Sequence, residues 1–142
     1  MSDAAEGRGY PGYVSSRPIS GYRVPQHVQN LVIRDYAQRR GFLYKLSGTE
    51  YAIDHCYMML EQLVSELPSH EGIIAYSMFM LPQRAERRLR IYQRILAAGC
   101  GLHAAVEDFG LEREKDIARW EDVWQVHQLL AASPGPDVRP VS

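Results

Sequence analysis

Apolar and polar residues follow two different spacings along this chain. Four short runs are mostly apolar, as the strands of a buried sheet are, and they cover residues 12–16, 42–47, 72–80 and 101–107. Elsewhere apolar residues recur every three or four positions, which is typical of helices, over residues 25–41, 54–68, 84–99 and 112–132. The pattern therefore predicts strands that alternate with helices.

Glycine and proline mark the ends of these helices. Pro25 suits a first helical turn, Gly41 and Gly99 suit helix ends, and Pro68 stops the second helix. Strands separated by helices, without hairpin turns, favour parallel βαβ units. We therefore expect an α/β fold: three layers, a mostly parallel sheet of order about 2-1-3-4 with helices on both faces, and a long C-terminal helix.

The length and composition fit one domain. The 142 residues are 46% hydrophobic, which is enough to build one core. Residues 1–9 and 133–142 are rich in small residues, polar residues or proline, and we expect them to be a disordered N-terminal tail and a flexible C-terminal tail. The domain is expected to span residues 10–132.

The net charge and the cysteines indicate which partners and which cellular compartment to expect. A net charge of -1 gives no general attraction to nucleic acid, so a nucleic-acid partner is not expected. The arginines of residues 84–94 are expected to lie on the solvated face of a helix. Cys56 and Cys100 lie far apart, and no apolar run is long enough to span a membrane. These features predict a cytoplasmic protein without a membrane partner.

The loops after the strands carry the candidate chemistry. In a parallel sheet these loops open on one edge, where ligands bind. Ser15, Ser16 and Arg17 precede a helix N-terminus that favours an anion, and Arg23 adds a second guanidinium. The alternative is that the serines bond the loop backbone while Arg17 pairs with Glu50. The other loop residues at this edge are Thr49, Tyr51, Gln83, Arg84, Glu107 and Asp108.

Three residues are candidates for catalysis. A nucleophilic serine needs a base, and His103 is a distant candidate that also fits a hydrogen-bonded core position. Glu50, beside Tyr51, is either a general base, an acceptor for a ligand hydroxyl, or an ion-pair partner of an arginine. Ser16 would then orient the substrate. Neither a metal site nor a cofactor is expected, because ligand-like spacings and phosphate-binding glycine loops are missing.

Two families resemble the chain. The order of "GYVSSR", "SGTEYA" and "GIIAYSMFML" resembles the catalytic domain of serine recombinases of the resolvase and invertase type, roughly from Gly12 to Gly110. The arginines that those enzymes need fall on Val14 or Ser15, on Met80 and on Gln83, so recombination is not expected. The resemblance leaves two serines, Ser16 and Ser20, for the nucleophile position.

The second resemblance covers nearly the whole domain. The stretches "RVPQHVQNLVIRDYAQRRG", "LSGTEYAIDHCYMMLEQLVSELP" and "GIIAYSMFMLP" are similar to the small sporadic carbohydrate cluster proteins. That family has a resolvase-like fold and is encoded beside bacterial genes for surface-sugar biosynthesis. The resemblance implies an accessory or ligand-binding protein of that pathway, which would hold an anionic sugar, a sugar nucleotide or a pathway enzyme.

Two alternatives stay open, and an oligomer is expected. The chain is otherwise a small enzyme that acts on a sugar intermediate through Glu50 or His103, or a DNA-binding relative of the serine recombinases. The final helix places Trp120, Val123, Trp124 and Leu130 along one side, which is more apolar surface than one sheet face needs. We therefore expect a homodimer or a larger assembly.

Overall fold

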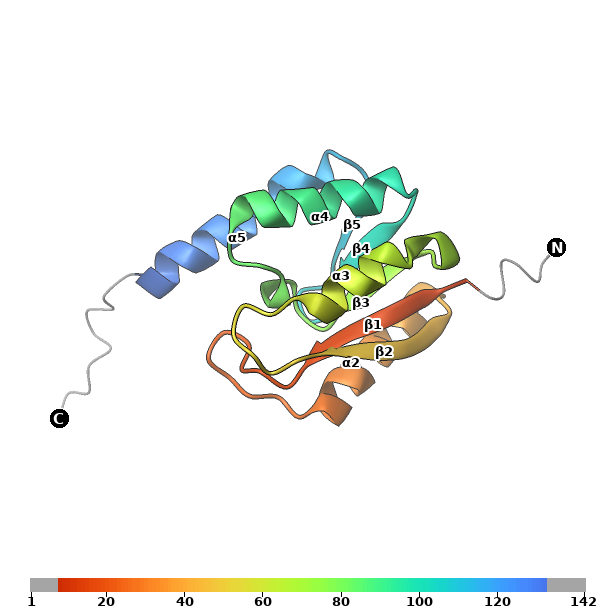
Figure 1. Ribbon diagram of the computed structural model, residues 1–142, viewed down its shortest axis with the longest axis horizontal. Helices are drawn as coiled ribbons and strands as arrows, with labels where there is room; N and C mark the ends of the chain where they lie inside the picture. Colours follow the sequence, from red (N-terminus) through yellow and green to blue (C-terminus); the bar gives the residue numbers. More distant parts are fainter. Residues whose placement is uncertain (1–7, 133–142) are drawn as a thin grey trace.

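The computed structural model of the chain describes residues 8–132. The predicted tails lie outside the described residues, apart from Arg8 and Gly9. The described part contains one five-stranded sheet of order β2-β1-β3-β4-β5 (Figure 1). Its strands are β1 (Tyr10–Ser15), β2 (Tyr44–Glu50), β3 (Gly72–Ala75), β4 (Gly101–Ala104) and β5 (Phe109–Leu111). The first four are parallel, and β5 is antiparallel to β4.

Helices connect the strands. They are α2 (Gln26–Arg40), α3 (Met58–Ser65), α4 (Ala85–Ala97) and α5 (Asp116–Ala132), with short 3-10 helices η1 (Leu67–Ser69) and η2 (Met78–Met80). No helix within residues 8–132 is long and apolar enough to cross a membrane.

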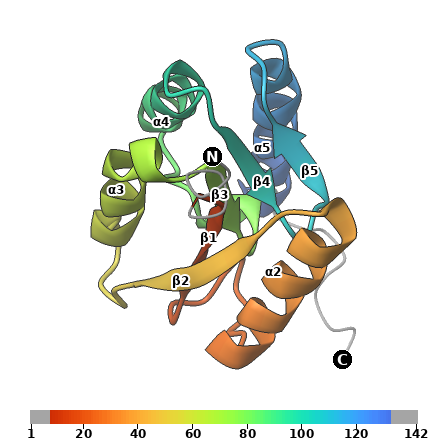
Figure 2. The same ribbon diagram turned by 90° about the vertical axis from the view of Figure 1, so that its right-hand side faces the viewer.

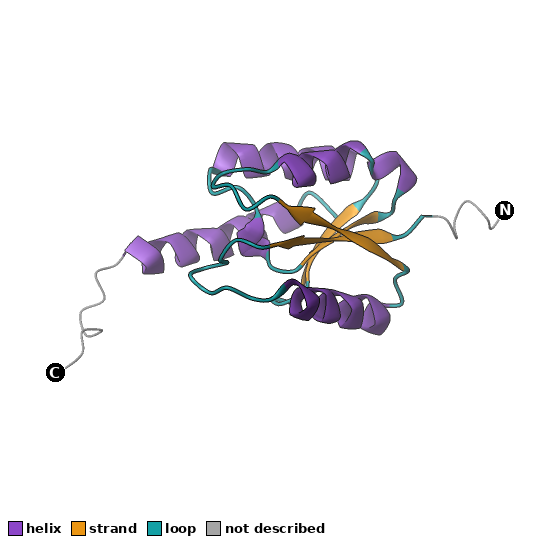
Figure 3. Ribbon diagram, turned by 60° about the horizontal axis from the view of Figure 1, so that its bottom comes forward, coloured by secondary structure: helices purple, strands orange, loops and turns teal. Residues whose placement is uncertain are grey.

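The sheet forms the middle of three layers. α2 covers one face, and α3 and α4 cover the other (Figures 2 and 3). Ile73 and Leu102 turn to the core under α3 and α4, whereas the next residue of β3, Ile74, turns to the core under α2. This alternation follows from the period of two along a strand. The predicted α/β fold with a parallel 2-1-3-4 order is confirmed.

The C-terminal helix packs beside α4 and then extends beyond the sheet (Figure 1). Its tryptophans, Trp120 and Trp124, are buried in the same core as Tyr92 of α4. They therefore do not form the exposed apolar surface from which the sequence predicted an oligomer. The exposed apolar residues of α5 are Val126, Leu129 and Leu130.

Two predicted strands are too long. β3 ends at Ala75, and the apolar residues after it form η2, where Ser77 Oγ accepts a hydrogen bond from the backbone N–H of Phe79. β4 ends at Ala104, because the chain turns through Asp108, at φ 61°, into β5. A strand of only three residues gives no periodic signal, so β5 was not predicted.

Two helices begin later than predicted, and one arginine that was expected to be exposed is buried. α3 begins at Met58 and α5 at Asp116, whose carboxylate accepts hydrogen bonds from the backbone N–H groups of Glu112 and Arg113. The expectation of a solvated basic face was wrong for Arg88, which is only 2% exposed. Its position on α4 falls against α5 and not against solvent.

Candidate functional site

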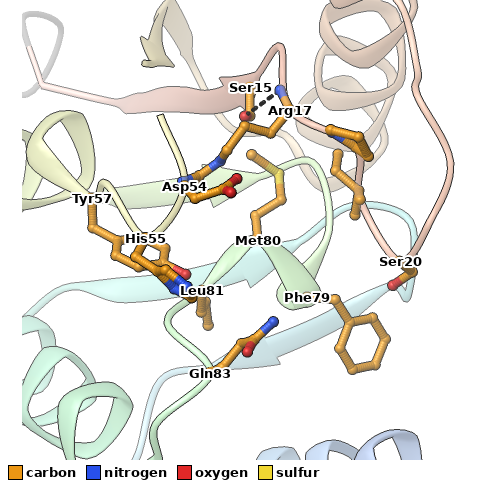
Figure 4. Close-up of a pocket in the computed structure, with 12 residues that line it drawn as sticks. Ser15, Arg17, Ser20, Asp54, His55, Tyr57, Phe79, Met80, Leu81 and Gln83 are labelled. Carbon is orange, nitrogen blue, oxygen red and sulfur yellow. Dashed lines mark hydrogen bonds between the residues drawn. The ribbon is translucent and has the colours of Figure 1, made fainter. Parts of the chain in front are cut away.

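A pocket of about 270 Å³ opens at the carboxyl ends of the central strands (Figure 4). Three loops form it: the loop after β1, the loop between β2 and α3, and the segment between β3 and α4. This is the edge where parallel sheets bind ligands. The residues that line it are Ser15, Arg17, Pro18, Ile19, Ser20, Asp54, His55, Tyr57, Phe79, Met80, Leu81 and Gln83.

Gln29 of α2 fixes the end of β1. Its buried side-chain amide donates to the carbonyl of Ser15 (2.7 Å) and of Val24 (2.8 Å), and its oxygen accepts from the backbone N–H of Ser15 (3.0 Å). The Ser15 hydroxyl oxygen accepts from the backbone N–H of Arg17 at 3.0 Å. Ser15 is therefore a loop-bonding serine, as one of the two alternatives held.

The loop after β1 ends in a tight turn at the pocket mouth. Ile19 and Tyr22 exchange two backbone hydrogen bonds, of 2.7 and 3.0 Å, around Ser20 and Gly21. Both central residues have positive φ, 52° and 85°, as a tight two-residue turn requires. The turn brings Ser20 to the pocket lining.

Arg17 joins the first loop to the second. Its Nη1 donates to the carbonyl of Ile53 at 2.9 Å, and its guanidinium carbon lies 5.1 Å from the ring centre of Tyr57. Burial raises the pKa of Tyr57, so that ring stays neutral beside the cation. Within the described residues Arg17 forms no ion pair with Glu50, so this part of the alternative was wrong.

The carboxylate of Glu50 accepts hydrogen bonds from the backbone at the start of α3. Oε1 accepts from the Tyr13 hydroxyl (2.7 Å) and from the N–H of Leu60 (3.1 Å), and Oε2 accepts from the N–H groups of Met59 (3.0 Å) and Tyr51 (3.2 Å). The residue is 1% exposed and does not line the pocket. Glu50 thus satisfies the free N–H groups at the start of a helix, where a general base would need an open face.

The remaining predicted ligand residues lie outside the pocket lining. Arg23 Nη1 donates to the carbonyl of Ser16 at 3.2 Å, which holds the loop but leaves both residues away from the pocket. Tyr51 is half exposed and does not line the pocket. Of the six predicted ligand residues, the structure brings only Ser15 and Arg17 to the pocket.

His103 lies on the opposite face of the sheet. Its ring is fully buried among Tyr10, Tyr36 and Phe42, and Nδ1 is 2.8 Å from the Tyr36 hydroxyl. Burial, helped by Arg40, lowers the pKa of His103 to about 4. Nε2 lies 3.4 Å from Glu112 Oε2 without the alignment of a hydrogen bond. His103 is a core histidine, and it does not reach the pocket.

Sequence reasoning missed Asp54, His55 and Tyr57. They were assigned to a helix because their neighbours have helical spacing, but the chain is irregular here and His55 has φ 61°. Residue spacing does not reveal this, because the start of α3 depends on hydrogen bonds from its backbone N–H groups to Glu50, which lies in the preceding strand. With α3 beginning at Met58, residues 54–57 become pocket lining.

The third wall of the pocket is the segment Phe79–Gln83. The two residues before it are held by Glu107, which accepts from the Ser77 hydroxyl (2.7 Å) and from the backbone N–H of Met78 (2.9 Å). Gln83 places an amide at the pocket. Figure 4 shows Arg17, Asp54 and Gln83 around the same hollow, with Phe79 at one side.

The pocket therefore has a polar part and an apolar part. Arg17, Asp54, His55, Gln83 and Ser20 supply a cation, a carboxylate, an imidazole, an amide and a hydroxyl. Such groups bind hydroxyls and an anionic substituent, and aromatic rings pack against the apolar face of a ligand. Within residues 8–132 no cluster of three or more His, Cys, Asp or Glu residues is arranged to hold a metal ion.

The solved structures that are similar to this chain include two recombinases. The N-terminal catalytic domain of TP901-1 integrase matches with a TM-score of 0.58 and 11% identity, over 84% of this chain and 98% of the other. A resolvase family site-specific recombinase from Streptococcus pneumoniae matches with a TM-score of 0.57 and 12% identity, over 86% and 90%.

The sequence itself gives no match to a protein-family model or to a curated protein. The resemblance to the carbohydrate cluster proteins therefore stays a prediction. Because the two solved structures share only 11 to 12% identity with this chain, they support the fold alone. The chain has the fold of a resolvase-type catalytic domain.

Proposed function

We propose that the chain is a binding protein for an anionic sugar or a sugar nucleotide, with an accessory role in bacterial surface carbohydrate biosynthesis and no recombinase activity. The observation that carries the proposal is the pocket itself, where Arg17 stands beside Asp54, Gln83 and aromatic rings. The pathway comes from the resemblance to the carbohydrate cluster proteins.

The chemistry of the lining supports a hydroxylated anion over a plain anion. Arg17 suits a phosphate or a carboxylate, because its planar donors match their oxygens. Asp54 would repel a bare phosphate, but its carboxylate accepts hydrogen bonds from sugar hydroxyls. An anionic substituent near Arg17 and hydroxyls near Asp54 and Gln83 satisfy both features.

Calorimetric titration with UDP-glucose, UDP-glucuronic acid and glucose 1-phosphate tests the proposal. We expect at least one of them to bind, and Arg17→Ala to weaken that binding by about 1.5 to 3 kcal/mol, the value of a charge-assisted hydrogen bond. Arg90→Ala, an exposed arginine of α4, is the matched control and should bind as the wild type does. If none of the three ligands binds at millimolar concentration, the proposal is wrong.

The enzyme alternative now depends on other residues. Glu50 and His103 are buried away from the pocket, so Asp54 and His55 are the carboxylate and the imidazole that line it. Incubation of the protein with each ligand, followed by mass spectrometry, separates binding from turnover. Unchanged ligand supports the binding protein, whereas a new mass that disappears in Asp54→Asn and His55→Ala makes the chain an enzyme.

The fold keeps the recombinase relative as a second candidate. In this structure, however, Ser15 is 2% exposed and its oxygen serves the loop, while Met80 and Gln83 stand where recombinase arginines were sought. We expect the pure protein not to retard duplex DNA in a gel at physiological salt, because its net charge is -1. Retardation under those conditions would favour the recombinase relative.

A further inference from the structure

The pocket wall Phe79–Gln83 rests on α5, which lies outside the pocket. The ring of Phe79 stacks on the ring of His127, with centres 3.8 Å apart and planes 17° apart. The same ring meets Trp124 edge-on at 5.1 Å. At the other end of the wall, the carbonyl of Gln83 accepts a hydrogen bond of 3.1 Å from Gln128 Nε2. Both ends of one pocket wall are therefore in contact with α5.

Arg88, a buried arginine of α4, connects the same wall to α5. Arg88 Nη1 donates to the carbonyls of Pro82 (3.0 Å) and Gln83 (2.8 Å). Its Nε and Nη2 donate to the carboxylate of Glu121 on α5 at 2.8 and 2.6 Å, and its guanidinium lies 4.1 Å from the Trp124 ring centre. A buried guanidinium needs all these partners, so the wall and α5 hold each other in place.

We propose that α5 is a positioning element of the pocket. Its residues His127 and Gln128 set the position of the Phe79–Gln83 wall, and thereby the ligand affinity of a site that they do not line. This inference rests on the proposed function for the ligand, but the positioning of the wall stands without it. Linkage makes the effect reciprocal, so a ligand that fixes the wall also restrains the last turns of α5.

These last turns carry the exposed apolar residues Val126, Leu129 and Leu130. They flank the two contact residues, His127 and Gln128, within about one turn of helix. The state of the pocket is therefore transmitted to an apolar stripe on the outside of the molecule.

Hydrogen exchange without ligand tests the positioning of the wall. The amides of Met80 and Leu81 bond the carbonyls of Ser77 and Met78 within η2, at 3.2 Å each. In His127→Ala these two amides should exchange at least several-fold faster than in the wild type. His127→Phe keeps a ring for Phe79 to stack on and should restore slow exchange, and the exposed α5 residue in Gln125→Ala serves as the matched control.

Ligand titration tests the reciprocal effect. UDP-glucose should bind His127→Ala several-fold more weakly than the wild type, with His127→Phe and Gln125→Ala close to the wild type. Ligand should also slow exchange over residues 124–132 in the wild type, but not in Arg17→Ala, whose pocket lacks its cation. A loss of affinity without any change in α5 exchange would not support the reciprocal effect.

The outcomes separate this inference from the proposed function. If the wild type binds UDP-glucose while His127→Ala has the same affinity and the same Met80 and Leu81 exchange, the positioning role is wrong and the binding function stands. If no ligand binds, the proposed function fails, and exchange in His127→Ala alone decides the positioning role. Unchanged exchange in that variant overturns the inference in either case.

Discussion

At the scale of single residues, Glu50 combines a buried charge with a complete set of donors. Glu50→Gln replaces one carboxylate oxygen by a donor, which then faces either backbone N–H groups or the Tyr13 hydroxyl. We expect a loss of about 3 kcal/mol in the free energy of unfolding, measured by urea denaturation, because charge-assisted hydrogen bonds are lost in a buried site.

Glu114→Gln is the control for that change, since Glu114 is exposed. It should alter the free energy of unfolding by no more than about 0.5 kcal/mol. Equal stability of Glu50→Gln and the wild type would show that the carboxylate does not hold the start of α3.

His103 makes stability depend on pH. Its pKa of about 4 in the folded chain is lower than the ordinary value of 6.5. Between these pH values His103 is protonated in the unfolded chain but neutral in the folded chain. The free energy of unfolding therefore falls as the pH falls from 6.5 to 4. The expected loss is about 3 kcal/mol, from roughly 2.5 pH units at about 1.36 kcal/mol each.

Urea denaturation at several pH values measures this loss in the wild type and in His103→Gln. The variant retains a side chain that can accept from the Tyr36 hydroxyl, and its stability should fall less between pH 6.5 and 4. His27→Gln, at an exposed histidine, should follow the wild type. Parallel profiles for His103→Gln and the wild type would show that the pH dependence does not come from His103.

At the scale of elements, α4 offers two arginines with equally short ion pairs and different burial. Arg88 meets Glu121 at 2.6 Å with 2% of its side chain exposed, and Arg94 meets Glu61 at 2.6 Å with 47% exposed. Arg88→Ala should cost about 3 to 5 kcal/mol, since it leaves the carboxylate of Glu121 without its cation and the carbonyl of Pro82 without its side-chain donor.

Arg94→Ala should cost less than about 1 kcal/mol, because water replaces the partner of an exposed carboxylate. Both values are read from urea denaturation of otherwise identical chains. Similar costs for the two variants would mean that the junction of α4 and α5 does not depend on the buried charge.

The elements that could be predicted are those with a repeated pattern. The helices show apolar residues at helical spacing over several turns, and the four parallel strands are short apolar runs between them. The order of these elements along the chain could therefore be predicted. β5 has three residues, and η2 continues the apolar run of β3, so neither had a pattern of its own. The start of α3 depends on a tertiary hydrogen bond from the backbone N–H of Met59 to Glu50, which spacing alone does not reveal.

The location of the candidate site could be predicted from the sequence, but most of the residues that line it could not. Parallel topology put the loops at one edge, and Ser15 and Arg17 were found there. Glu50 and His103 were chosen as polar residues near strands, but their contacts with α3 and with Tyr36 of α2 could not be predicted from the sequence. Asp54 and His55 reach the pocket only because the chain bends at a residue of positive φ.

At the scale of the whole molecule, Val126, Leu129 and Leu130 form an exposed apolar stripe on α5. We propose that copies of the chain pair through it, because apolar side chains on one helix side gain most by mutual burial. Light scattering at micromolar concentration should then give a mass above the 16.2 kDa of one chain.

The double variant Leu129→Glu, Leu130→Glu should return the mass to that of one chain. Arg90→Glu, on exposed α4 surface, should leave the assembly unchanged. A wild type that already scatters as a single chain would remove the reason for the pairing.

Gln29 holds the turn after β1 through the main chain of Ser15 and not through its side chain. The strand end therefore depends on a side chain of α2, whereas the Ser15 hydroxyl adds only the hydrogen bond from the N–H of Arg17. Ser15→Ala would remove that one bond and leave both main-chain bonds to Gln29. The polar character of position 15 and the path of the backbone are thus set by two different residues.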